Sequence, residues 1–206
     1  MWNAWRDGDE PVELLNLVRR LHPSDRKMRL VAAAFCRHAP DTATSERDKD
    51  AIALAERLAD GLATDAERID AFRGASPRSF FSAARELLNW SSFQAAYQTL
   101  RTLGIGLPIP GSHRVDQQVR VHWCGLVRDV FGDLVHPVPL DASWRTGNVV
   151  DLSRTIYEEH AFDRLPILAD ALMDAGCNDE VIVEHCRGCG PHVRGCWVID
   201  LILGKT

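Results

Sequence analysis

Apolar residues recur at every third or fourth position along most of this chain, the spacing that predicts amphipathic helices. The pattern runs through residues 11–21, 25–35, 44–62, 64–72, 80–100, 115–131, 149–160, 162–175 and 178–183, and again through the last residues of the chain. No stretch of useful length alternates between apolar and polar residues as a half-buried strand would. We therefore predict an all-α protein, an irregular bundle of many helices.

Several helix ends are marked by capping residues. Ser24 or Asp25 is expected to cap the helix that follows, and Thr64-Asp65-Ala66-Glu67 has the spacing of a capping box. Gly176 follows an apolar helical pattern and is expected to end that helix in a left-handed conformation. Gly190-Pro191 is expected to start the last helix, because proline is favoured in a first helical turn.

Two proline-rich segments interrupt the helices. Proline removes a backbone donor and biases the residue before it away from helix, so residues 104–112 and 133–146 are expected to be extended loops. With 206 residues the chain has the length of one sizeable domain, and we predict a single helical domain over residues 1–206. The alternative is a subdivision near 104–112, where the helical pattern breaks most clearly.

Composition and charge argue against several kinds of partner. The net charge of −5 makes a nucleic acid, held by a general basic surface, an unfavourable partner. No stretch reaches the roughly 18 apolar residues that span a bilayer and the N-terminus lacks a signal pattern, so we expect no membrane partner and a cytoplasmic location. The six cysteines are expected to stay reduced there, with Cys36 and Cys124 in the core.

The C-terminal region concentrates the residues that carry chemistry. Cys186, Cys189, His192 and Cys196 are spaced C-x2-C-x2-H-x3-C, and glycines between them allow a turn that brings thiolates together. A tetrahedral zinc ion needs four such soft or borderline donors. These four residues are therefore candidate zinc ligands, and His185 replaces Cys189 in a second candidate set.

The same region also suggests an anion site. Arg187, His192 and Arg194 lie beside the expected helix start at Gly190-Pro191, whose free backbone amides could hold a phosphate or carboxylate. The alternative is that these groups receive an internal carboxylate, because helix ends are usually satisfied within the fold. Asp200 lies in an apolar run and is expected to be buried, with an arginine or a helix N-terminus as its partner.

A third interpretation is a cysteine-dependent enzyme. A cysteine near a helix start and beside histidines can have a lowered pKa and act as a nucleophile. His192 or His185 would then be the base and Asp200 the orienting group. Against this interpretation, residues close in sequence seldom have the mutual geometry of a catalytic triad, whose members usually come from distant segments. The arrangement also indicates no reaction class.

Much of the chain resembles a functionally uncharacterised family of bacterial proteins that occurs as many paralogues in large genomes. The likeness is carried by residues 162–172, 175–177, 185–187 and 190–198 with Asp200, and by shorter stretches at 26–30, 36–37, 55–61, 131–132, 137–138 and 140–141. Residues 76–112 match poorly. The family pattern does not usually have cysteine at the position of Cys189, and often has proline where Ala142 stands, so a function of Cys189 would be peculiar to this chain.

The chain lacks a phosphate-binding loop, a His-Glu helix motif and a complete nucleophile motif. The leading interpretation is therefore a non-enzymatic cytoplasmic helical domain that acts as an accessory or regulatory subunit through contacts with another protein. The alternatives are a zinc-binding or anion-sensing protein that uses the C-terminal cluster, and a cysteine-dependent enzyme.

Overall fold

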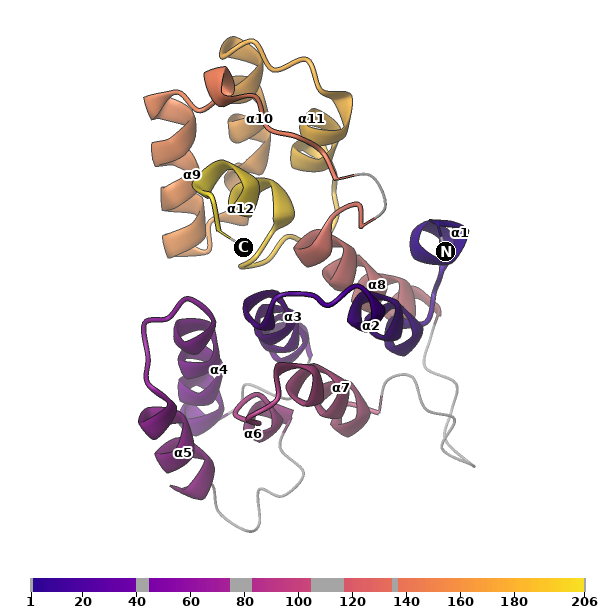
Figure 1. Ribbon diagram of the computed structural model, residues 1–206, viewed down its shortest axis with the longest axis vertical. Coiled ribbons are helices and arrows are strands. Elements are labelled where there is room, and N and C mark those ends of the chain that lie inside the picture. The colour runs from indigo at the N-terminus through magenta and orange to yellow at the C-terminus, as the bar shows by residue number, and fades with distance from the viewer. Residues whose placement is uncertain (1, 40–44, 75–82, 105–116, 135–136, 206) are drawn as a thin grey trace. The chain divides into compact units, whose positions relative to one another are not determined.

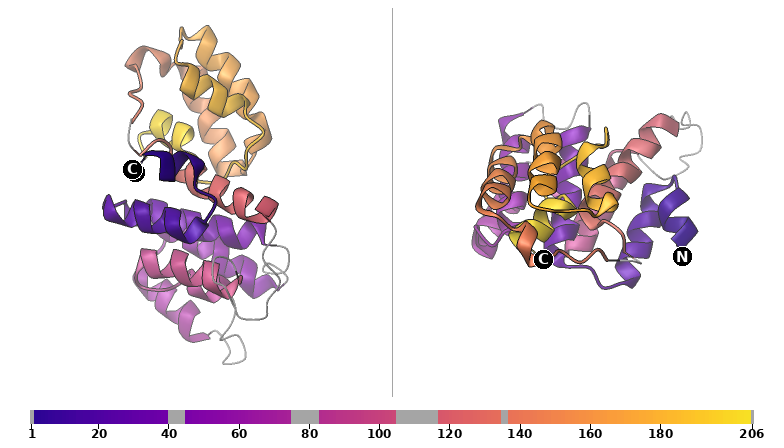
Figure 2. Two further views of the ribbon diagram at one scale, coloured as in Figure 1. Left: turned by 90° about the vertical axis from the view of Figure 1, so that its right-hand side faces the viewer. Right: turned by 90° about the horizontal axis from the view of Figure 1, so that it is seen from above.

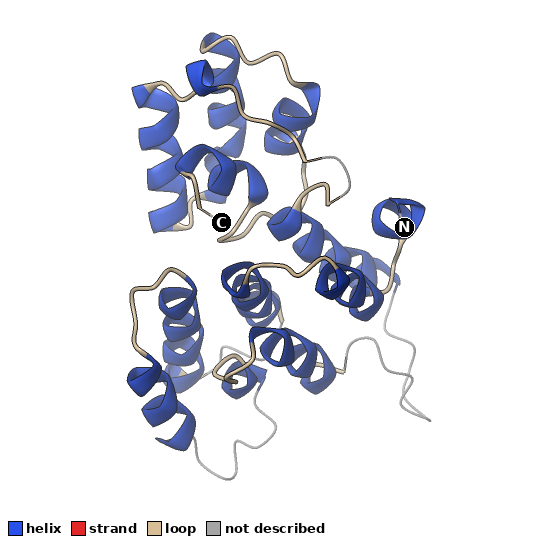
Figure 3. Ribbon diagram, in the orientation of Figure 1, coloured by secondary structure: helices blue, strands red, loops and turns tan. Residues whose placement is uncertain are grey.

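The computed structural model describes residues 2–39, 45–74, 83–104, 117–134 and 137–205. Within these ranges the chain forms twelve α-helices and two short 3-10 helices, and no strand (Figures 1 and 3). The prediction of an all-α protein is confirmed. No helix in the described residues is long and apolar enough to cross a bilayer.

The chain divides into two compact units, Met1–Val127 and Arg128–Thr206, where the sequence predicted one domain. The division falls inside helix α8 (Gln117–Phe131), whose last residues belong to the second unit. The segment near 104–112, named above as the alternative boundary, lies largely outside the described residues.

The first unit is built around helix α3. It contains α1 (Trp2–Asp7), α2 (Pro11–Arg20), α3 (Asp25–His38), α4 (Glu46–Ala59), α5 (Asp65–Gly74), α6 (Ala83–Glu86), α7 (Ser92–Thr102) and most of α8. Helix α3 packs against α7 and α4, and each of its residues from Met28 to Cys36 is buried. Cys36 and Cys124 are fully buried, as predicted.

Side chains cap the helices of this unit as the sequence predicts. The Ser24 hydroxyl accepts the Lys27 amide at the start of α3. Before α5, the Thr64 hydroxyl accepts the Glu67 amide at 3.2 Å, while the Glu67 carboxylate accepts the Thr64 amide at 2.7 Å. Each bond satisfies a backbone donor that a helix start leaves without an intrahelical partner.

Helices α3 and α4 are joined by a two-pronged ion pair. The Arg37 guanidinium donates from Nε and Nη2 to the two carboxylate oxygens of Glu56, at 2.6 and 2.9 Å. The Glu56 side chain is only 5% exposed, whereas that of Arg37 is 40% exposed, so water weakens this pair in part but less than an ion pair exposed on both sides.

We expect Glu56→Gln to lower the free energy of unfolding by about 1–2 kcal/mol, because a neutral amide loses the charge-assisted bond to Arg37. Urea unfolding followed by circular dichroism measures this change. The matched control is Glu46→Gln on the same helix, where the ion pair with Lys49 is largely exposed and no measurable change is expected. Equal effects of the two substitutions would contradict the prediction.

The second unit holds α9 (Gly147–Glu159), α10 (Leu165–Asp174), α11 (Glu180–Arg187) and α12 (Trp197–Leu203), with 3-10 turns at Ala142–Trp144 and Phe162–Arg164. Helix α10 packs against α9 and α11, and α12 packs against the same two helices (Figures 1 and 2). Leu165, Leu172, Ile182, Ile199 and Ile202 are among the core residues between them. Gly176 ends α10 with φ +88°, as predicted.

The last helix begins at Trp197, not at Gly190-Pro191 as expected. Residues 188–196 form turns instead, because Gly195 takes φ +98° and the Cys196 amide bonds back to the Val193 carbonyl at 2.9 Å. The Val193 amide, which a helix start would leave free, bonds to a carboxylate brought in by α8. That tertiary contact could not be read from the local sequence.

Candidate metal site

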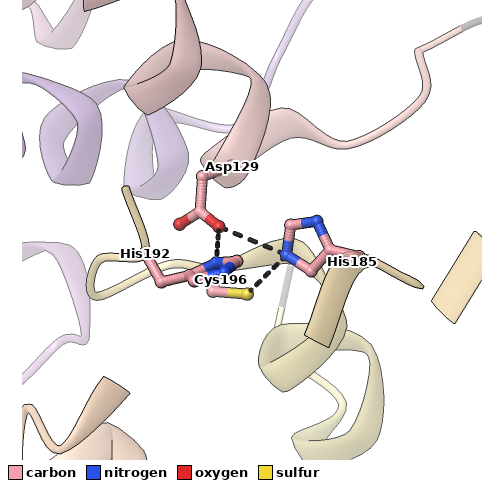
Figure 4. A group of neighbouring side chains, drawn as sticks. All are labelled: Asp129, His185, His192 and Cys196. Atoms are coloured by element: carbon pink, nitrogen blue, oxygen red, sulfur yellow. Dashed lines mark hydrogen bonds and ion pairs between the residues drawn. The ribbon is translucent and has the colours of Figure 1, made fainter. Parts of the chain in front are cut away.

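Four side chains that can bind a metal meet in the second unit: Asp129, His185, His192 and Cys196 (Figure 4). Asp129 lies near the end of α8, and His185 lies in the last turns of α11. His192 and Cys196 come from the turns before α12, and Cys196 is the residue that caps this helix. Three separate chain segments therefore supply the cluster.

The donor atoms of the cluster are close enough to share one ion. The Asp129 Oδ1 atom lies 2.7 Å from His192 Nδ1 and 3.2 Å from His185 Nε2. His185 Nε2 lies 3.2 Å from the Cys196 Sγ atom, and all four donor atoms lie within 4.8 Å of one another. Ligands of a tetrahedral zinc ion are about 3.3–3.7 Å apart, as follows from bond lengths of about 2.0–2.3 Å.

Asp129 is the centre of this cluster. Its side chain is only 3% exposed; its Oδ1 atom contacts both imidazoles, and its Oδ2 atom accepts the Val193 amide at 2.9 Å. Burial raises the pKa of Asp129, but the hydrogen bonds that its carboxylate accepts from His185 and His192 hold this pKa below its usual value. Asp129 is therefore ionised, with one oxygen directed at the cluster.

His192 has the surroundings of a typical metal ligand. Burial lowers its pKa, but the hydrogen bond to Asp129 and its charge outweigh burial and raise the pKa above the ordinary value. Its other ring nitrogen, Nε2, donates to the Gly188 carbonyl at 3.3 Å. Metal-binding histidines usually donate their second N–H to a carbonyl or carboxylate in this way, which fixes the ring.

His185 is held differently, because its second nitrogen is an acceptor. The Trp197 indole donates from Nε1 to His185 Nδ1 at 3.0 Å. The indole itself rests on Gly132, which has φ +64°; a Cβ atom added there would lie 2.8 Å from the Trp197 ring. Gly132 thus leaves room for the side chain that orients His185.

Cys196 is a buried thiol. Burial raises the pKa of Cys196 well above its ordinary value, and the Asp129 charge raises it further. The amides of Ile199 and Val198 at the start of α12 lower it, but by less. A reactive thiolate needs the opposite environment, with a positive charge and partial exposure.

The other cysteines of the C-terminal region lie outside the cluster. Cys186 faces the hydrophobic core of the unit, where burial raises its pKa to about 12, and Cys189 is exposed. Of the five residues that the sequence nominated as zinc ligands, the structure thus brings together His185, His192 and Cys196. The raised pKa values of Cys186 and Cys196 offer no support for either thiol as a nucleophile.

The candidate anion ligands point to separate partners. Arg187 donates to the Asp170 carboxylate of α10 at 2.6 Å, and the Arg194 guanidinium lies 4.4 Å from the centre of the Tyr157 ring. His192 belongs to the Asp129 cluster. Asp200, expected to be buried, is 1% exposed.

Solvent reaches the edge of the cluster through a cleft of about 310 Å³. His192 lines this cleft together with Phe162, Leu165, Gly188 and Cys189. The cleft gives small ions a route to His192, whose side chain is 10% exposed. An access route of this kind is one requirement of a metal site.

Comparison of the chain with protein-family models, curated proteins and solved structures gave no match. The resemblance to a bacterial paralogue family therefore stays a prediction. Asp129 is the member of the cluster that the sequence did not indicate. It lies in a helical apolar pattern more than fifty residues before His185. A carboxylate in a helix is usually interpreted as exposed to solvent, so the sequence offered no reason to place Asp129 in a site.

We expect Asp129→Asn to lower the free energy of unfolding by about 2–3 kcal/mol, measured by urea unfolding with a chelator present. An asparagine has a single acceptor oxygen, and its NH2 group can only donate, so it cannot accept both from the imidazoles and from the Val193 amide. The matched control is Asp163→Asn in the same unit, an exposed position where no measurable loss is expected. Unchanged stability of Asp129→Asn would mean that the carboxylate does not hold these segments together.

Proposed function

We propose that the second unit of this protein binds one divalent transition metal ion, with zinc as the best match, through Asp129, His185, His192 and Cys196. The convergence of four donors from three chain segments within 4.8 Å carries the proposal. Bound there, the ion would link α8, α11 and the turns before α12. The ion would thus stabilise the arrangement of these segments. We propose that the protein is a metal-binding or metal-responsive protein.

The chemistry of the donors favours zinc over the hard cations. Imidazole and thiolate are ligands of zinc and similar transition metals, whereas magnesium and calcium prefer oxygen. Asp129 Oδ1 completes a set of one oxygen, two nitrogens and one sulfur. Such mixed sets occur in tetrahedral zinc sites.

Charge balance supports a dication in this buried place. The Asp129 carboxylate and a Cys196 thiolate together carry two negative charges, and the two imidazoles are neutral when they bind metal. A divalent cation makes the assembly neutral, so no net charge is buried. Coordination also explains how a thiol in apolar surroundings can ionise, because a bound metal deprotonates its thiol ligand outright.

Four protein ligands leave no open coordination position, which is the pattern of a structural or regulatory site and not of a catalytic one. This agrees with the sequence, in which no enzyme motif is complete. We prefer metal binding to the protein-interaction role predicted from the sequence. Metal binding is supported by four donor atoms that lie close together, whereas the interaction role was inferred mainly from the absence of enzyme motifs.

The test compares two cysteine-to-serine variants after dialysis against a chelator and addition of Zn²⁺ or Co²⁺. We expect about one equivalent of bound metal in the wild type. Loss of a residue that only orients a ligand weakens metal binding roughly 10–100-fold. Cys196→Ser removes a ligand itself, so we expect a larger loss of affinity. It should still fold, because serine is a preferred helix cap.

Cys189→Ser is the matched control, since the Cys189 thiol is exposed and outside the cluster. It should bind Co²⁺ with the same thiolate-to-cobalt absorption as the wild type, while Cys196→Ser should lack this band. Metal content is measured by elemental analysis of the desalted protein. Absence of bound metal in the wild type, or loss of the band in Cys189→Ser alone, would overturn the proposal.

A further inference from the structure

We infer that Trp197 is a positioning residue that opposes metal binding, because its indole holds His185 in the tautomer that cannot coordinate an ion through Nε2. This inference rests on the proposed metal site and concerns its regulation. The hydrogen bond lowers the affinity of the site for metal, and its loss at Trp197 would report that an ion is bound.

The argument begins with the direction of one hydrogen bond. An indole N–H can only donate, so His185 Nδ1, which lies 3.0 Å from Trp197 Nε1, must be an acceptor without hydrogen. A neutral imidazole carries one hydrogen, which is then on Nε2. That hydrogen points into the cluster, where Asp129 Oδ1 and Cys196 Sγ both lie 3.2 Å from Nε2.

A metal ion at this place needs the lone pair of Nε2. The neutral ring must then carry its hydrogen on Nδ1, directly opposite the indole hydrogen of Trp197. Two hydrogens cannot share that 3.0 Å gap. A 180° rotation of the His185 ring does not remove this conflict, because a carbon atom would then take the place of Nε2 at the metal. Metal binding and the indole hydrogen bond therefore exclude each other.

His192 shows the opposite arrangement in the same cluster. Its Nε2 atom faces the Gly188 carbonyl, an acceptor, so the ring can keep its hydrogen there while Nδ1 faces the other donors. The His192 imidazole is thus in the tautomer that can bind metal, whereas the His185 imidazole is in the tautomer that cannot. The outer partners of the two rings, a carbonyl and an indole, make this difference.

The position of Trp197 determines where its side chain can go. Trp197 is the first residue of α12, directly after the ligand Cys196, and its ring is packed on Gly132 at one side. Trp197 is partly exposed, and its indole is packed against the core of the unit as well as on Gly132. A metal ion in the cluster would therefore break the hydrogen bond between His185 and the partly exposed Trp197 side chain.

The first test measures Co²⁺ and Zn²⁺ affinity of Trp197→Phe, which keeps an aromatic ring but has no donor. We expect the variant to bind metal about threefold to tenfold more tightly, the equilibrium equivalent of one lost competing hydrogen bond. A tryptophan that merely supports the fold would give weaker binding when replaced. Trp144→Phe in the same unit is the control and should leave the affinity unchanged.

The second test uses the wild-type chain, so it holds even where Trp197→Phe folds poorly. Two-bond nitrogen–proton correlation spectra report histidine tautomers, and His185 should change from Nε2–H to Nδ1–H when Zn²⁺ is added. The indole N–H signal of Trp197 should shift while those of the other five tryptophans do not.

The outcomes separate the two proposals. No bound metal in the wild type would overturn the metal site itself. Bound metal with equal or weaker affinity in Trp197→Phe, or with His185 still protonated on Nε2, would overturn the role of Trp197 alone and leave the metal site standing.

Discussion

The Asp129 carboxylate is the contact on which the second unit depends most. Its two oxygens bond to His185, to His192 and to the Val193 amide, so a single buried side chain joins α8 to α11 and to the turns before α12. A buried carboxylate is costly unless its oxygens are satisfied. Here the hydrogen-bond partners of Asp129 come from distant segments of the chain. The hydrogen bonds that satisfy this one carboxylate therefore hold all of these segments in place.

The same donors can serve two purposes. Hydrogen bonds to Asp129 hold the cluster together through protons, and a divalent cation would hold it through coordination. In the first arrangement the hydrogen bond to Asp129 raises the pKa of His192 and so favours its charged form beside the carboxylate; in the second, a dication balances Asp129 and Cys196. The cluster is therefore a place where protons and metal compete for the same atoms.

Residues around the cluster set the balance of this competition. The Gly188 carbonyl favours His192 as a ligand, whereas the Trp197 indole disfavours His185. Gly132 matters because it has no side chain: any Cβ there would collide with Trp197. Small features outside the cluster thus decide how readily it accepts an ion.

The sequence by itself determined the helical class, the burial of Cys36 and Cys124, the capping box at Thr64 and the left-handed cap at Gly176. These follow from periodicity and from contacts between residues a few positions apart, which short-range sequence patterns contain. It also pointed to the C-terminal region as the place of His185, His192 and Cys196.

Only the tertiary structure decided which of those residues meet, and with what. Asp129 joins them from a helix far back in the chain, whereas Cys186 turns into the core and Cys189 to the surface, although all the spacings suit a zinc site. The start of α12 at Trp197 was not predicted either, because the chain before it turns at Gly195, with φ +98°, and the Cys196 amide bonds back to the Val193 carbonyl. The bond from the Val193 amide to Asp129 adds a long-range contact that no local pattern records.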